Sequence, residues 1–324
     1  MSRKGAGSIV RTDAVPRQII SITNGLGADA EVIFNPAGRG GAAQALLPEV
    51  IQHFGEAGIS VRETRAPGDE ERFASEAIGR GVTTIVVVGG DGTCSNVANA
   101  ILRERSQCRL AVVPAGTGND FVKTLGIRNH SIPEIVGLVS RGGATSIDVG
   151  VADGRYFINS CGFGFDASVL EATGRVKFLK GDALYIYAAL AQLFTYRGVP
   201  VGVDRGVLPS DRELLMATVS NGRFLGGAFR IAPDASVTDG ELDICLIGNA
   251  SVRQRIRLFA AAMRGTHSRF PAVEMFKSSS LLLSFSVPPS IELDGELRQA
   301  ASREVRISCV PRALRVIAAP GAPL

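Results

Sequence analysis

The chain has 324 residues, of which 45% are hydrophobic and 20% are charged, and its formal net charge is +4. This length is enough for two domains that each bury a core, and the composition is that of a globular protein rather than a disordered or fibrous one. The small net charge, without interleaved basic and aromatic residues, argues against nucleic-acid binding. Five cysteines without a CxxC pair indicate free thiols rather than a zinc or redox site.

The N-terminal residues and the overall hydropathy bear on location. The first 28 residues are polar and slightly basic, without the apolar core of a signal peptide. They predict a flexible tail over residues 1–28. No apolar run approaches the ~20 residues that a membrane span requires. We therefore expect a cytoplasmic protein that meets the inner face of a membrane, if at all, only peripherally.

From residue 31, short apolar runs alternate with longer segments of helical period. The predicted strands are 31–34, 59–64, 83–88 and 110–113. The predicted helices are 42–54, 69–80 and 94–101. This alternation indicates a parallel sheet covered by helices, in which ligands bind at the carboxyl ends of the strands. The sequence therefore predicts a Rossmann-like α/β domain over residues 29–146.

After about residue 146, many short β-branched or apolar runs are separated by Gly, Pro and Asp. This pattern is typical of a mostly antiparallel β domain, predicted over 147–324, whose last residues are free to return to the first domain. Two helical segments, 179–196 and 252–270, interrupt it. The second carries Arg253, Arg257 and Arg264 and no acidic residue. Such a row is typical of a solvated helix face, and it also suits contact with an anionic membrane surface.

The strongest chemical signal is Gly89-Gly90-Asp91-Gly92-Thr93, which follows a predicted strand and opens a helix. Successive glycines let backbone N–H groups close around phosphate oxygens, and the helix N-terminus adds a partial positive charge. Phosphate would repel the carboxylate of Asp91, so we expect it to act through Mg²⁺ or on an attacking hydroxyl. In a single loop, a plain glycine-rich turn gives the same pattern.

Two further loops of this kind make coincidence less plausible. Pro-Ala-Gly-Thr-Gly-Asn-Asp-Phe at 114–121 follows the next predicted strand, and Asn-Pro-Ala-Gly-Arg-Gly-Gly at 35–41 follows the first. The loop at 35–41 lacks the Gly-Lys-Ser/Thr ending of a Walker A loop. Because the carboxyl ends of parallel strands meet at one edge of the sheet, we expect the three loops to converge on one crevice.

Together these motifs resemble the catalytic domain of diacylglycerol kinases, a family that includes sphingosine kinases and bacterial lipid kinases. The resemblance spans about residues 30–297 and also rests on Asp-Gly-Glu-Leu-Asp at 239–243 and Leu-Asp-Gly-Glu at 293–296. It implies an ATP- and Mg²⁺-dependent kinase that phosphorylates the hydroxyl of diacylglycerol or a similar lipid alcohol. The second domain is then expected to be a β-sandwich that receives the lipid, with ATP between the domains.

The resemblance also implies roles for individual residues. Glu296 or Asp294 is expected to accept the lipid hydroxyl proton, while Asp91 orders the reacting centre. Phosphoryl transfer does need one carboxylate near the nucleophile. The expected ATP contacts are Asn35, Thr64, Gly90, Asp91, Gly92, Thr93, Cys94, Ser95, Asn96 and Thr117.

By the same resemblance, Asp239 is expected to hold a structural Mg²⁺ together with backbone oxygens near Ser236 and Glu241, since hard cations take oxygen ligands. Asp-Gly is also among the commonest turn dipeptides, so this motif alone has a plain structural explanation. Two departures from the family pattern affect particular residues. The first loop is one residue shorter than in the family, and Gly38 stands where the family usually has a small polar residue. Asn96 stands where the family commonly has Glu.

Two other functions stay open at the level of sequence. One is a kinase for a soluble acceptor, because NAD kinases and phosphofructokinases share a Gly-Gly-Asp-Gly turn. The loop at 114–121 and the late Leu-Asp-Gly-Glu favour a lipid, without naming the lipid or the oligomeric state. The other is a nucleotide- or lipid-binding protein without turnover, against which the presence of Asp91, Asp294 and Glu296 argues.

Overall fold

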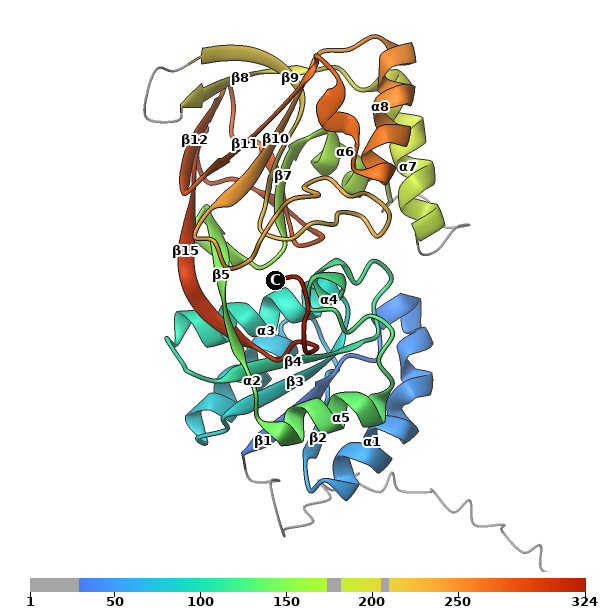
Figure 1. Ribbon diagram of the computed structural model, residues 1–324, viewed down its shortest axis with the longest axis vertical. Coiled ribbons are helices and arrows are strands. Elements are labelled where there is room, and N and C mark those ends of the chain that lie inside the picture. The colour runs from blue at the N-terminus through green and yellow to red at the C-terminus, as the bar shows by residue number, and fades with distance from the viewer. Residues whose placement is uncertain (1–28, 174–181, 205–209) are drawn as a thin grey trace, which may run out of the picture.

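The computed structural model describes residues 29–173, 182–204 and 210–324, and the tail predicted over 1–28 lies outside them. Two halves are stacked along the long axis, a lower α/β half and an upper half that is mostly β (Figure 1). The C-terminus lies between them. This arrangement confirms the predicted fold class.

The lower half is a parallel sheet in the order β4-β3-β1-β2, with helices around it. Its strands are β1 (Ala30–Phe34), β2 (Ser60–Glu63), β3 (Thr84–Gly89) and β4 (Arg109–Pro114). Its helices are η2 (Gly38–Leu46), α1 (Leu47–Glu56), α2 (Asp69–Gly79), α3 (Asp91–Arg103), α4 (Asp120–Thr124) and α5 (Ile132–Arg141). Every residue of β1 and β3 is buried, as expected for strands covered on both faces. The ends of β1, β3 and β4 are therefore neighbours.

The helix predicted over 42–54 begins later than expected. Three consecutive residues, Arg39, Gly40 and Gly41, have positive φ, which interrupts the 3-10 turn η2 before α1 starts. The apolar period of the sequence predicts Ala42 and Leu46 on the buried face, but the side chains buried here are those of Ala43 and Leu47, each one position later. The glycines of the first loop thus shift the helical register as well as shape the loop.

The upper half is built mainly from antiparallel strand pairs. Its strands are β5 (Thr145–Ala152), β6 (Arg155–Phe157), β7 (Ser160–Gly164), β8 (Val199–Asp204), β9 (Ser210–Ser220), β10 (Leu242–Gly248), β11 (Val273–Ser278), β12 (Ser280–Phe285), β13 (Ser290–Leu293), β14 (Glu296–Gln299) and β15 (Glu304–Val316). Three helices and a 3-10 turn lie on one side of it (Figure 1): α6 (Phe165–Thr173), α7 (Asp182–Thr195), α8 (Val252–Arg264) and η3 (His267–Arg269).

Only two of these helices, α7 and α8, were predicted from the sequence. Helix α6 was not predicted, and residues 179–181 of the helix predicted over 179–196 lie outside the described residues. The helix predicted over 252–270 ends at Arg264, because Gly265 takes the left-handed conformation that caps a helix. No helix in the described ranges combines the length and the apolar character needed to cross a bilayer.

Two long strands join the halves. β15 pairs antiparallel with β12 in the upper half, and at Arg315 and Val316 it pairs parallel with β4 in the lower half. β5 runs antiparallel beside β15 along both sections (Figure 1). One hydrogen-bonded ladder therefore continues through both halves and fixes the space between them. The boundary proposed at 146/147 falls within β5 and stays a prediction.

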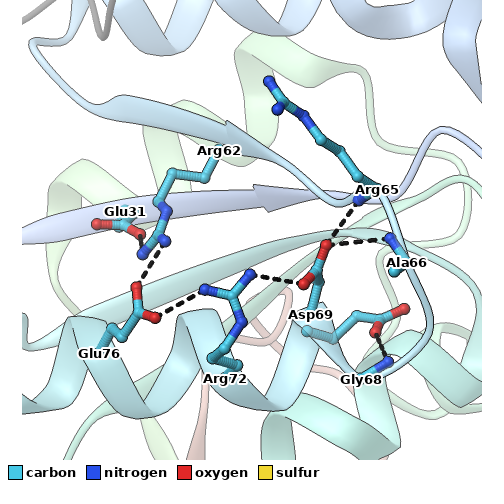
Figure 2. Close-up of polar contacts among 9 residues, drawn as sticks. Glu31, Arg62, Arg65, Ala66, Gly68, Asp69, Arg72 and Glu76 are labelled. Atoms are coloured by element: carbon cyan, nitrogen blue, oxygen red, sulfur yellow. Dashed lines mark hydrogen bonds and ion pairs between the residues drawn. The ribbon is translucent and has the colours of Figure 1, made fainter.

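A chain of ion pairs holds α2 against the edge of the parallel sheet (Figure 2). Its members are Glu31, Arg62, Asp69, Arg72 and Glu76. Asp69 Oδ2 also accepts the backbone N–H groups of Arg65 and Ala66, at 2.8 and 3.0 Å. The hydrogen bond from Arg72 and these backbone contacts lower the pKa of Asp69 to about 2. These contacts fix the turn that follows β2 and Thr64.

Candidate active site

The three glycine loops touch one another at the ends of β1, β3 and β4. A Cβ added at Gly116 would lie 2.3 Å from Gly90 Cα, and one at Gly38 would lie 2.5 Å from the carbonyl oxygen of Ala115. Only glycine allows such close approaches. Arg39 adds a hydrogen bond of 3.1 Å from Nε to the carbonyl oxygen of Gly116. The loops therefore form one continuous rim at the edge of the sheet.

The expected ATP contacts divide into two groups. The partly exposed members are Gly90, Asp91, Gly92, Asn96 and Thr117. Asn35 lies beside them, with its Nδ2 2.9 Å from Thr93 Oγ1. The buried members are Thr64, Thr93, Cys94 and Ser95. Burial raises the pKa of the Cys94 thiol well above its usual value. The buried side chains build the frame of the site, so only their backbone groups are placed to meet phosphate.

A cavity of about 270 Å³, lined by several carboxyl groups, lies where the two halves meet, and we call it the catalytic cavity. Asp91 and Asp120 line it from the lower half, and Asn159, Glu292 and Asp294 line it from the upper half. Two of the three expected catalytic carboxylates are thus brought together. Glu296, the third, is the first residue of β14 and lies beside the start of α3, where its Oε1 would be 3.4 Å from a Cβ added at Gly92.

Asp91 is partly buried and lightly hydrogen-bonded. Its Oδ1 accepts the backbone N–H of Phe121 at 3.2 Å, and its Oδ2 lies 3.2 Å from a Cβ added at Gly118. Burial, followed by the negative charge of Asp120, raises the pKa of Asp91 to about 7. A carboxyl group with a pKa in this range exchanges protons readily near neutral pH.

Asp294 is held much more tightly. Its Oδ1 accepts the backbone N–H groups of Asn159 and Ser160 at 2.8 and 3.0 Å, and its Oδ2 accepts that of Ile158 at 2.9 Å. Ser95 adds a side-chain hydrogen bond. Burial raises the pKa of Asp294, although these hydrogen bonds act in the opposite direction. Both oxygens are engaged, so this carboxylate anchors the segment between β6 and β7.

Glu296 is the end of a chain of polar contacts across the cleft. Its Oε1 accepts Nδ2 of Asn96 at 3.1 Å, and its Oε2 lies 3.3 Å from Arg298. Arg155 donates to Oδ1 of Asn96 and pairs with Glu71 at 2.8 Å. An amide can accept from Arg155 and donate to Glu296 at once, which a carboxylate cannot do. At the position where the resemblance predicts a Glu, Asn96 is therefore a group that bridges two side chains.

Two carboxyl groups that line the catalytic cavity, those of Asp120 and Glu292, were not predicted from the sequence. Asp120 pairs with Lys123 at 2.6 Å and accepts the backbone N–H of Gly227 at 2.9 Å. It was visible inside the loop at 114–121 but received no role. Glu292 directly precedes the Leu-Asp-Gly-Glu motif at 293–296, and this position was the signal that could have found it.

The predicted magnesium residues lie apart from the catalytic cavity. Asp239 Oδ1 accepts the backbone N–H of Glu241 at 3.1 Å, while Oδ2 pairs with Lys277 at 2.6 Å. Lys277 also lies 3.3 Å from Asp243, and the Ser236 hydroxyl bonds elsewhere. Within the described ranges, no three His, Cys, Asp or Glu residues converge on a metal position. Lys277 already neutralises Asp239 in this arrangement. The expected Mg²⁺ site, Asp239 with backbone oxygens near Ser236 and Glu241, stays a prediction.

Comparison with known proteins follows the two halves. Residues 29–152 match the family described as diacylglycerol kinase catalytic domain, and residues 159–318 match the YegS C-terminal NAD kinase beta sandwich-like domain. The chain is 30% identical over 270 residues to the diacylglycerol kinase of Bacillus subtilis (strain 168), covering 82% of this chain and 89% of that one. The chain belongs to the diacylglycerol kinase family.

Other relatives agree with this membership. A Pseudomonas aeruginosa (strain UCBPP-PA14) protein named "Probable lipid kinase YegS-like" is 30% identical over 275 residues, covering 82% of this chain and 86% of that one. The fold alone is shared with a crystal structure of a diacylglycerol kinase from Bacillus anthracis str. Sterne, with a TM-score of 0.69 at 21% identity, covering 92% of this chain and 100% of that one. The predicted resemblance is confirmed, and with it a lipid-kinase family that uses ATP and usually a divalent metal.

Proposed function

We propose that this protein transfers the γ-phosphate of ATP to the hydroxyl of diacylglycerol or a similar lipid alcohol. The observation that carries the proposal is that two cavities are neighbours, since Leu225 lines both the catalytic cavity and an apolar one. The apolar cavity, of about 80 Å³, lies between β9, β10 and helices α6, α7 and α8. An alkyl chain that enters it places its polar end toward Asp91. A soluble acceptor would have no use for the apolar cavity.

The site residues divide the reaction between them. The glycine loops present backbone N–H groups to the phosphates, and a divalent metal bound with ATP would neutralise their charge. Asp91 takes the proton of the lipid hydroxyl. The hydroxyl oxygen bonds to the γ-phosphorus of ATP as the bond from that phosphorus to the ADP oxygen breaks. Asp294 positions residues 158–160 instead of acting as the base, because both of its oxygens are engaged. This division differs from the sequence-based expectation, which gave the proton to Glu296 or Asp294.

The test is transfer of labelled γ-phosphate from ATP by the purified protein, with Mg²⁺ or with EDTA. Acceptors are diacylglycerol, a long-chain amino alcohol and a prenol in mixed micelles, together with NAD and sugar phosphates. We expect label in a lipid with Mg²⁺ and none with EDTA. Label only in a soluble acceptor would refute the lipid acceptor, and ATP binding without transfer to any acceptor would favour a binding protein.

We further propose that this protein contacts an anionic membrane through α7 and α8. Both helices line the apolar cavity, with Leu193 from α7 and Leu258 from α8. Their outer surface carries exposed apolar residues, which are Tyr187, Leu190, Phe194, Val252, Ile256 and Met263. Exposed arginines of α8 stand among them, at 253, 257 and 264. Apolar and basic side chains together suit an interface of acyl chains and anionic headgroups.

Replacement of Phe194 by serine is expected to weaken binding to anionic phospholipid vesicles by roughly 10-fold or more, because Phe194 is 61% exposed and would lose its apolar burial in the bilayer. Sedimentation with vesicles measures this. Ile51→Ser is the matched control, since Ile51 is 44% exposed on α1, in the lower half of the molecule (Figure 1). Equal binding by wild type and Phe194→Ser would contradict the proposed contact.

A further inference from the structure

The side chain of Leu225 belongs to the walls of two cavities. Among the described residues, Leu225 alone lines both the catalytic cavity and the apolar cavity. Helix α6 also borders both, since Phe165 and Asp166 line the apolar cavity while Leu170 and Thr173 line the catalytic one. Each cavity therefore has one wall from α6 and one from Leu225. The boundary between the two cavities lies at this leucine, which is only 6% exposed.

Leu225 stands at one end of a tight turn formed by residues 225–229. Its backbone N–H donates to the carbonyl oxygen of Phe229 at 2.9 Å, and the N–H of Phe229 donates back to Leu225 at 3.0 Å. Between them, Gly226 and Gly227 have φ of 58° and 80°, which glycine adopts without strain. Residues directly opposite in an antiparallel pair have their side chains on the same face. Leu225 and Phe229 accordingly both line the apolar cavity.

Both halves of the molecule hold this turn in place. From the lower half, Asp120 Oδ2 accepts the backbone N–H of Gly227 at 2.9 Å, and Lys123 Nζ donates to the carbonyl oxygen of Gly227 at 2.6 Å. From the upper half, Asn159 Nδ2 donates to the carbonyl oxygen of Phe224 at 2.9 Å. Hydrogen bonds to charged groups are stronger than neutral ones. These contacts fix the turn, and with it the leucine at the boundary.

We propose that Leu225 is a specificity-determining residue of the acceptor site, and that it limits the width of the alkyl chain that passes from the catalytic cavity into the apolar cavity. This inference rests on the proposed lipid kinase function. An acceptor whose hydroxyl reaches Asp91 extends its chain past Leu225. A straight chain fits there, whereas a methyl branch at that point collides with the fixed leucine, because close-packed interiors do not absorb an added methyl group without strain. The acceptor is then a lipid alcohol with an unbranched chain at this point, which disfavours a prenol.

The experiment measures kcat/KM for diacylglycerols whose chains are straight or carry a single methyl branch at successive carbons. The same series in a long-chain amino alcohol is used if that is the acceptor of the wild-type protein. In wild type we expect branches within one short stretch of the chain to lower kcat/KM by roughly 10-fold or more, the usual effect of one misplaced carbon in a shaped pocket. Leu225→Ala removes the obstructing side chain and should relieve most of this loss at the same carbons.

Leu258→Ala is the matched control, because Leu258 is 5% exposed and lines the apolar cavity but not the catalytic one. It enlarges the apolar cavity away from the boundary, so the loss at those carbons should persist. Leu225→Phe tests the opposite direction, since a larger side chain should extend the loss to the straight chain while short-chain acceptors that end before the boundary keep their kcat/KM. Thermal unfolding establishes that each variant is folded.

Two classes of outcome are distinguishable. Equal relief by Leu225→Ala and Leu258→Ala, a branch penalty that neither Leu225 variant changes, or preferred phosphorylation of the prenol would overturn this inference alone. A wild-type protein that phosphorylates no lipid would overturn the proposed function, and this inference with it.

Discussion

Replacing Asp91 by asparagine is expected to lower kcat by about 10²- to 10⁴-fold, because an amide cannot take the proton of the lipid hydroxyl. The same change is expected to raise the free energy of unfolding at pH 8. Burial and the charge of Asp120 raise the pKa of Asp91 to about 7 in the folded protein, above the value of about 3.9 for an unfolded chain. The folded state therefore binds this proton more tightly than the unfolded state does.

The sign of the pH dependence follows from this order of pKa values. The stabilising effect of the proton is fully present below about pH 4 and is lost as the pH rises through about 7. Above that pH, a partly buried and ionised Asp91 destabilises the fold, and asparagine removes this effect. We expect a gain of roughly 1–3 kcal/mol at pH 8 and little gain at pH 4. Denaturant unfolding at the two pH values measures the difference.

A second measurement concerns the rate. Wild-type kcat/KM for the lipid should rise with pH along a limb centred near the pKa of about 7, because only the deprotonated form of Asp91 accepts a proton. The control is Glu134→Gln, an acid-to-amide change at the N-terminus of α5, where Gln still completes the capping box. Near-normal turnover in Asp91→Asn would remove Asp91 from the role of base.

The glycine loops were predictable because their requirement is local. A Gly-Gly-Asp-Gly turn after an apolar run needs no partner elsewhere in the chain to be recognised as a strand end that opens a helix, and Gly90 is indeed the residue before α3. The strand–helix period then placed the three loops at one edge. The glycine loop placed Asp91 in the site, and the family resemblance placed Asp294 there. Neither fixed their roles, since only the hydrogen bonds to residues 158–160 distinguish them.

Two buried carboxyl groups, those of Asp166 and Glu292, lie next to each other across Gly162. Their proximity could not be predicted, because it depends on hydrogen bonding between distant strands. Glu292, Gly162 and Thr218 adjoin because β13, β7 and β9 are neighbours, although they come from three separate parts of the sequence. Asp166 reaches the pair from α6, a short helix with a weak apolar pattern that periodicity did not predict. A glycine that makes room for another element's side chain leaves no mark in its own local sequence.

Asp294→Ala is expected to cause the largest loss of stability among these changes. The substitution leaves the backbone N–H groups of Ile158, Asn159 and Ser160 buried without an acceptor. Each such donor costs about 1–3 kcal/mol, partly relieved by water or local rearrangement, so we expect a total loss of roughly 3–5 kcal/mol. Chemical denaturation measures it, and an unchanged midpoint would contradict the anchoring role.

Asp294→Asn separates anchoring from proton transfer. Its amide keeps the shape and one acceptor oxygen, so part of the stability and the position of residues 158–160 should be retained. If Asp294 only positions this segment, the folded Asp294→Asn enzyme keeps more of its kcat than the folded Asp91→Asn enzyme. If Asp294 were the base, the order would be reversed, because Asp91 would then lose only an orienting contact. Turnover per folded molecule in the two asparagine variants therefore decides which carboxylate takes the proton.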